Sequence, residues 1–125
     1  MSTLMRLAYL ILSLCIIAFG LIHIAAAPRL FSHLTTAAVW FASGGLAIML
    51  TGALNLLRRA YGENAPGLRV VCVLANVLMT GFALLAGYVS RASAGQFVLV
   101  LALLGGATVL SLLPGTQNLR AVSQK

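Results

Sequence analysis

The sequence predicts an all-α integral membrane protein, an up-down four-transmembrane-helix bundle built as two antiparallel hairpins in tandem. Of its 125 residues, 62% are hydrophobic and only 7% are charged, and the mean hydropathy is +1.08. Soluble domains carry about a quarter charged residues, so this composition excludes a surface that faces water over most of its area. The apolar residues also fall into four long runs, which predict the individual helices.

The four runs have the length of membrane spans. They cover residues 4–27, 35–57, 67–89 and 95–113. Each has roughly 19 to 24 residues, enough to cross a hydrocarbon core of about 30 Å as a helix. No water is present there to hydrogen-bond the backbone, so each run is expected to be helical. The short links make neighbouring helices antiparallel and predict a single membrane domain over 1–125, ending in a short tail over 114–125.

The first run has a second interpretation, a cleaved signal peptide. Arg6 precedes its apolar stretch, and three alanines, Ala25, Ala26 and Ala27, close it. The stretch is longer than the usual apolar region of about 7 to 15 residues in a signal peptide. We therefore interpret it as a span.

The basic residues predict the orientation. With the N-terminus in the cytoplasm, the inner side would carry Arg6, Arg58, Arg59, Arg69, Arg120 and Lys125, and the outer side only Arg29 and Arg91. This bias is typical of cytoplasmic loops, so both termini are expected in the cytoplasm, most simply at a bacterial inner membrane. The basic residues lie between apolar runs, which argues against a nucleic-acid partner. The link 58–66 is expected to be a solvated turn whose arginines face lipid headgroups.

Small residues predict where the helices touch, because close backbone approach supports association in lipid. The candidate helix-packing residues are Gly44, Gly45, Gly52, Gly105 and Gly106. The first run is bulkier, with Ala8, Leu12, Cys15, Phe19 and His23 along one stripe. The second, third and fourth runs are therefore expected to pack more tightly than the first. Cys15 and Cys72 are expected to be small buried hydrophobes.

The polar residues within the runs limit the chemistry. No Asp, Glu, Lys or Arg lies in the middle of a run, which argues against a proton-coupled pump or a channel for charged substrates. Asn76 and Thr51 are expected at similar depth, with Asn55 about one turn away. These three would tie the second and third helices together by hydrogen bonds. In the alternative, Asn76 and Thr51 contact a ligand.

His23 is the most informative residue. It lies near the outer end of the first run, at a depth where Trp40 and Tyr88 are also expected. The aromatic residues fit an interfacial belt, and the imidazole would then bond a carbonyl, a Thr or water. Alternatively, His23, Trp40 and Tyr88 form the mouth of a ligand site. No cofactor or metal site is otherwise predicted, although His23, with His33 in the outer loop, is a candidate haem ligand.

Three functions therefore stay open, and the absence of a catalytic motif weighs against an enzyme. The first is an accessory or assembly subunit, or a homo-oligomeric membrane protein, whose partners would be the lipid bilayer and a second membrane chain. The second is a carrier or binder of a neutral lipophilic molecule, such as a lipid, a quinone or a drug-like compound. The third is a haem-binding redox protein that uses His23.

Overall fold

Over residues 3–113, the part of the chain that the computed structural model describes, helices joined by short links confirm the predicted bundle. The elements are α1 (Thr3–Leu30), α2 (Thr36–Tyr61), α3 (Pro66–Val89), and a fourth span made of α4 (Ala94–Val100), a π-helical segment η1 (Leu101–Gly105) and α5 (Gly106–Leu112). All four spans are long and apolar enough to cross a membrane. The predicted tail over 114–125 lies outside the described residues.

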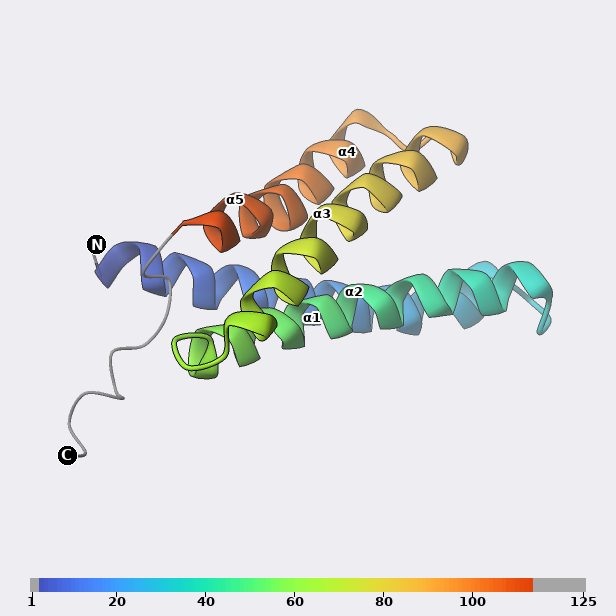
Figure 1. The fold of residues 1–125 in the computed structure, drawn as a ribbon. Helices are drawn as coiled ribbons and strands as arrows, with labels where there is room; N and C mark the ends of the chain where they lie inside the picture. Colours follow the sequence, from blue (N-terminus) through green and yellow to red (C-terminus); the bar gives the residue numbers. More distant parts are fainter. Residues whose placement is uncertain (1–2, 114–125) are drawn as a thin grey trace.

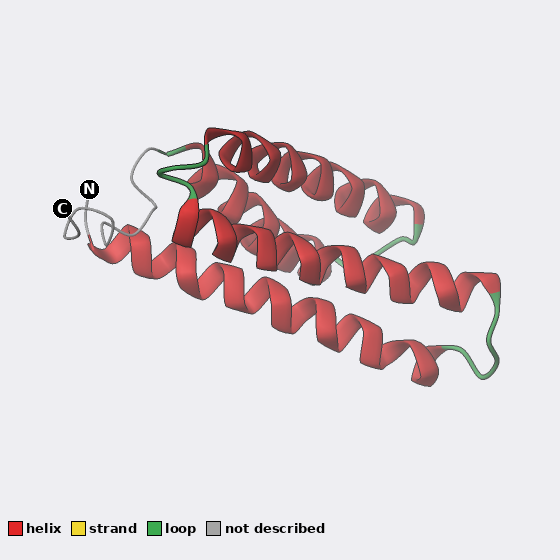
Figure 2. Cartoon of the chain, turned by 60° about the horizontal axis from the view of Figure 1, so that its bottom comes forward, coloured by secondary structure: helices red, strands yellow, loops and turns green. Residues whose placement is uncertain are grey.

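The spans form two hairpins, one of α1 and α2 and the other of α3 with α4–η1–α5. The start of α1, the α2–α3 turn and the end of α5 share one end of the molecule, which we call the arginine end because Arg6, Arg58, Arg59 and Arg69 lie there (Figure 2). The α1–α2 loop and the α3–α4 turn share the other, which we call the aromatic end. The hairpins cross near the arginine end and diverge toward the aromatic end (Figure 1).

The helix ends follow local sequence signals. The Thr35 hydroxyl accepts a hydrogen bond from the Ala38 amide at 3.2 Å and begins α2. Pro66 occupies the first turn of α3, where its missing N–H costs nothing. Ser93 and Gln96 form a reciprocal capping box that begins α4. Because each of these helices begins at a defined residue, the links before them can be short and still reverse the chain.

Helix α2 is longer than expected, and this corrects the prediction for Arg58. The helix continues to Tyr61, so Arg58 and Arg59 lie in its last turn, where cations interact favourably with the helix dipole. Arg58 is only 2% exposed. The prediction that it lies in a solvated turn is therefore wrong, because the helix extends beyond the point where the apolar run ends.

The tightest helix contact joins α1 and α2, which corrects the expected packing order. A Cβ added at Gly20 would lie 2.6 Å from the Gly45 carbonyl oxygen, and one added at Gly52 would lie 2.8 Å from the Ser13 carbonyl oxygen. The buried face of α1 carries Tyr9, Ser13, Ile16, Gly20 and Ala27. It is displaced by one position from the bulky stripe that the sequence suggested. Cys15, on that stripe, is exposed, whereas Cys72 is buried as expected.

The fourth span packs through a different face from the one that its paired glycines suggested. Its buried residues are Leu104, Ala107 and Ser111. A Cβ at Gly106 would meet Leu12 at 3.3 Å, but one at Gly105 would meet only Leu101 of its own span, at 3.9 Å. The π-helical turn shifts the register of this span relative to a regular α-helix. Leu104 and Ala107 join Ile16, Ile48 and Met79 in the apolar core between the hairpins.

We predict that Gly20→Ala destabilises the protein by about 1 to 3 kcal/mol, because its Cβ would press on the backbone of α2. Unfolding in a mixed detergent series, followed by circular dichroism, measures the change. Gly81→Ala is the matched control, since nothing lies within 4 Å of its added Cβ. Equal stabilities of the two variants would contradict the close α1–α2 contact.

We also predict that Arg91→Gly stabilises the protein by about 1 kcal/mol, because Arg91 has a φ of 54°, in the left-handed region that favours glycine. The Ala92 amide bonds back to the Gly87 carbonyl at 2.9 Å and fixes this conformation at the end of α3. Ser90→Gly is the control, since Ser90 has a right-handed helical φ of −80°. The same unfolding series should show no gain for that variant.

Candidate functional site

Two features of the bundle carry polar chemistry, and the first is a buried cluster near the arginine end. We call it the polar cluster; its members are Tyr9 of α1, Asn55 and Arg58 of α2, and Cys72 and Asn76 of α3. Arg58 is 2% exposed and the other four are fully buried. The cluster therefore connects three helices and both hairpins.

A reciprocal amide pair forms its centre. The Asn55 amide donates to Asn76 Oδ1 at 2.8 Å, and the Asn76 amide donates to Asn55 Oδ1 at 2.8 Å. Asn55 Nδ2 also donates to the Thr51 carbonyl at 2.8 Å, so both of its hydrogens are used. Asn55 Oδ1 further accepts from the Tyr9 hydroxyl and from the Cys72 thiol. The expected Asn55–Asn76 link is present, but Thr51 contributes only its carbonyl, because its hydroxyl bonds to Ala47.

Arg58 adds a cation to this cluster. Its Nη1 donates to the Tyr9 hydroxyl at 3.2 Å, and its guanidinium lies 5.7 Å from the centre of the Tyr9 ring. A cation over an aromatic face is attracted by the negative face of the ring. Tyr9 therefore binds Arg58 through both its ring and its hydroxyl. The cluster holds the hairpins together at this end.

The second feature is a cavity of about 480 Å³ between the hairpins, toward the aromatic end. We call it the inter-hairpin cavity. Its volume lies within the range of about 300 to 1,000 Å³ that is typical of small-molecule sites. Small residues make room for it, namely Gly44 on α2 and Ala83, Ala86 and Gly87 on α3. No Asp, Glu, Lys or Arg is among the described residues that line it.

His23 lies in the wall of this cavity. Its ring stacks on Phe41, with centroids 3.9 Å apart and planes 18° apart, and Phe19 lies 6.2 Å away on the same helix. Within residues 3–113 the imidazole nitrogens make no hydrogen bond to protein. The carbonyl or Thr partner expected from the sequence is thus not found among these residues. His23 presents unused hydrogen-bonding capacity to an otherwise apolar space.

The other predicted site residues are divided between the two features. Trp40 lines the inter-hairpin cavity with His23, whereas Tyr88 is 77% exposed and does not line it. Asn76 belongs to the polar cluster and Thr51 is bonded to it through its carbonyl, and neither residue lines the cavity. The structure therefore brings together two of the three residues expected at the mouth of a ligand site.

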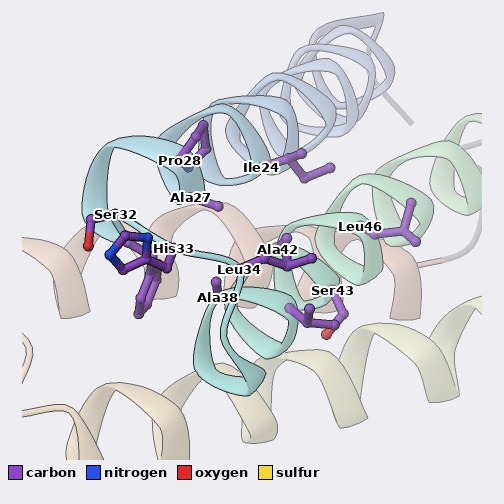
Figure 3. A pocket seen from close by; sticks show the side chains of 12 residues that line it. Ile24, Ala27, Pro28, Ser32, His33, Leu34, Ala38, Ala42, Ser43 and Leu46 are labelled. Carbon is purple, nitrogen blue, oxygen red and sulfur yellow. The ribbon is translucent and has the colours of Figure 1, made fainter.

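A separate groove lies along the aromatic end of α1 and α2 (Figure 3). It has a volume of about 670 Å³ and is lined by the C-terminal part of α1, the loop and the first turns of α2, including His33. His23 lines the other cavity, so the two histidines are not brought to a common site. Among the described residues, no group of three His, Cys, Asp or Glu side chains could hold a metal ion.

Two contributors to these features, Arg58 and Gln96, are not predicted from the sequence. Arg58 lies beyond the second apolar run and is therefore expected in a loop. The helix-forming residues Leu56-Leu57-Arg58-Arg59-Ala60 indicate instead that the helix continues past the run. Phe19 was expected on one stripe with His23, four positions away, and the two rings do lie next to each other. Gln96 is not among the predicted site residues, although its position three residues after Ser93 is typical of a capping box. Its place in the cavity wall depends on the hairpin arrangement.

We predict strong coupling between Asn55 and Asn76. In a double-mutant cycle of Asn55→Ala and Asn76→Ala, the interaction energy should reach about 1 to 2 kcal/mol, the upper part of the range for intramembrane hydrogen bonds. The cycle is measured by unfolding in mixed detergent. Asn55→Ala with Thr108→Val is the control pair, because Thr108 bonds to Leu104 and lies beside Thr80 instead. Additive effects of both pairs would contradict the reciprocal geometry.

Comparison with protein-family models, with curated proteins and with solved structures gives no match for this chain. The functional argument therefore depends on the cavity and the polar cluster. Of the two, only the cavity offers both space and unused hydrogen-bonding groups. The chain is a four-span membrane bundle with an uncharged inter-hairpin cavity next to His23.

Proposed function

We propose that this protein binds a neutral, lipophilic small molecule in the inter-hairpin cavity. The observation that carries the proposal is His23, whose imidazole faces the cavity without a hydrogen-bond partner among residues 3–113. A polar group in an apolar surrounding gains free energy when a partner arrives, by about 0.5 to 1.5 kcal/mol for a typical hydrogen bond. A guest with an apolar body and a polar atom next to His23 supplies that partner.

The charge pattern of the cavity supports a neutral guest. Its described lining carries no ionic group, and an unpaired charge placed there would lose its hydration without compensation. The hairpins diverge toward the aromatic end (Figure 1), and the cavity of about 480 Å³ lies between them there. A guest can therefore occupy the cavity without breaking the hydrogen bonds of the polar cluster at the other end.

The orientation is part of the same proposal. Arg6, Arg58, Arg59 and Arg69 lie toward one end, and Arg29 and Arg91 toward the other. The positive-inside bias supports a cytoplasmic arginine end and cytoplasmic termini in a bacterial inner membrane. The cavity would then lie in the outer half of the bilayer, where a lipophilic guest can exchange with the outer leaflet.

The expected role as an accessory subunit or homo-oligomer is less well supported, because one of its arguments was the glycine face of the second span. Gly45 and Gly52 contact α1 of the same chain, so these glycines do not form a surface for a second chain. Ligand binding has a specific site in its favour, and we therefore place it first.

We predict that bromonaphthalene, a neutral lipophilic quencher, quenches the fluorescence of Trp40 saturably in the detergent-solubilised protein. Trp40 is the only tryptophan and lines the cavity. Gly44→Leu should weaken binding at least about tenfold, because the Gly44 Cβ direction leads toward His23 Nε2, 3.8 Å away, and a larger side chain fills the cavity.

Gly81→Leu is the matched control for this titration. It adds the same side chain on α3 at an exposed position with nothing within 4 Å, and should leave the affinity unchanged. Circular dichroism verifies that both variants retain their helices. Quenching that never saturates, or that Gly44→Leu leaves unaltered, would overturn the proposal.

A further inference from the structure

Two side chains of the inter-hairpin cavity, His23 and Gln96, offer hydrogen-bond donors that are not used within the described residues. Gln96 Oε1 already accepts from the Ser93 amide at 2.7 Å, which leaves its amide hydrogens available. The Ser90 hydroxyl, in contrast, donates its hydrogen to the Gly87 carbonyl at 3.3 Å, so Ser90 has no free donor for a guest. His23 can contribute a ring N–H. A guest with acceptor atoms can therefore bond to both His23 and Gln96.

These two donors lie on different hairpins. His23 belongs to α1 and Gln96 to the first turn of α4, and both line the cavity. A guest that bonds to both would carry two separated acceptor atoms. Its body would lie between the hairpins, where the lining is apolar apart from these groups and Ser90.

The walls next to His23 favour a flat guest. Phe41 covers one face of the His23 ring, and Phe19, Trp40 and Phe82 also line the cavity. Flat conjugated rings pack well on aromatic side chains, with a gain beyond the burial of apolar area. Gly44 presents backbone without a side chain beside His23, which lets a plate-like molecule approach closely.

We infer that the guest is a flat conjugated ring compound with carbonyl oxygens, that is, a quinone-type molecule, whose oxygens accept hydrogen bonds from His23 and Gln96. The inference rests on the proposed function, since it specifies the chemical class that the cavity binds. The aliphatic floor of the cavity, formed by Ile48, Met79 and Val100, suits an apolar substituent on such a ring.

The test is a competition between two molecules of nearly the same shape. Methylnaphthoquinone and methylnaphthalene each displace bromonaphthalene from the purified protein, and the bromonaphthalene that stays bound is measured by equilibrium dialysis, because a quinone next to Trp40 would itself quench its fluorescence. His23→Phe keeps an aromatic ring against Phe41 and removes the hydrogen bond. Because each competitor is compared with itself across variants, its partition into detergent cancels.

The quinone should lose about fivefold to tenfold in affinity in His23→Phe, and the hydrocarbon should lose less than twofold. His23→Gln restores a donor and should recover part of the difference. Gln96→Glu keeps the capping oxygen but replaces the amide donor by an acceptor, and should also weaken the quinone selectively. Circular dichroism verifies the fold of every variant.

The outcomes separate the two proposals. Saturable bromonaphthalene binding with equal losses for both competitors in His23→Phe would overturn the quinone inference and leave the binding function intact. Absence of any saturable binding would overturn both. A preference for the quinone that persists unchanged in both His23→Phe and Gln96→Glu would also overturn the inference, because neither donor would then contact its oxygens.

Discussion

The reciprocal amide pair between Asn55 and Asn76 is the interaction on which the arrangement of the two hairpins depends. In lipid, apolar side chains gain nothing by leaving a solvent that is as apolar as they are, so hydrogen bonds and close packing must hold helices together. The pair has its hydrogen-bonding groups satisfied, and Tyr9 and Cys72 donate to the same Asn55 oxygen. Because these bonds lie near one end of the bundle, they fix the crossing of the hairpins there and leave the opposite ends free to diverge.

The glycine contact between α1 and α2 complements this pair. Gly20 and Gly45 bring two backbones together inside one hairpin, whereas Asn55 and Asn76 connect one hairpin with the other. The first contact sets the axial position of α1 along α2, and so decides that His23 stacks on Phe41. The second sets the divergence that opens the cavity. The candidate site thus depends on contacts made by residues that do not line it.

The sequence was sufficient to predict the four spans but not how they pack against one another. Bilayer thickness determines how long an apolar run must be, so the four runs predicted the four helices directly. The last turn of α2 was missed, because hydropathy falls at Arg58 whereas the helix continues to Tyr61. The face that α1 buries lies one position away from the predicted stripe. Neighbouring stripes of this helix are almost equally apolar, and only Gly20 indicates which of them contacts α2.

The candidate site was predictable only in part for the same reason. His23 and Trp40 could be chosen as polar or amphipathic residues at one depth, and the structure places both in one cavity wall. Phe82 and Gln96 join them through the angle between the hairpins, which no local pattern encodes. Tyr88 shares their depth, but it is exposed and does not line the cavity. The depth of a residue in the membrane follows from its position along the apolar run, whereas the direction in which its side chain points follows from how the helices pack.

The divergence of the hairpins has a consequence for the surrounding membrane. The chain occupies a larger cross-section at the aromatic end than at the arginine end (Figure 1). The leaflet around the aromatic end therefore contains a larger cross-section of protein than the other leaflet, and its lateral pressure acts on the cavity. Lipids with bulky, unsaturated tails press on the diverging helices and narrow the space between them. Loosely packed leaflets release that pressure, so we expect the width of the cavity to depend on lipid composition and curvature.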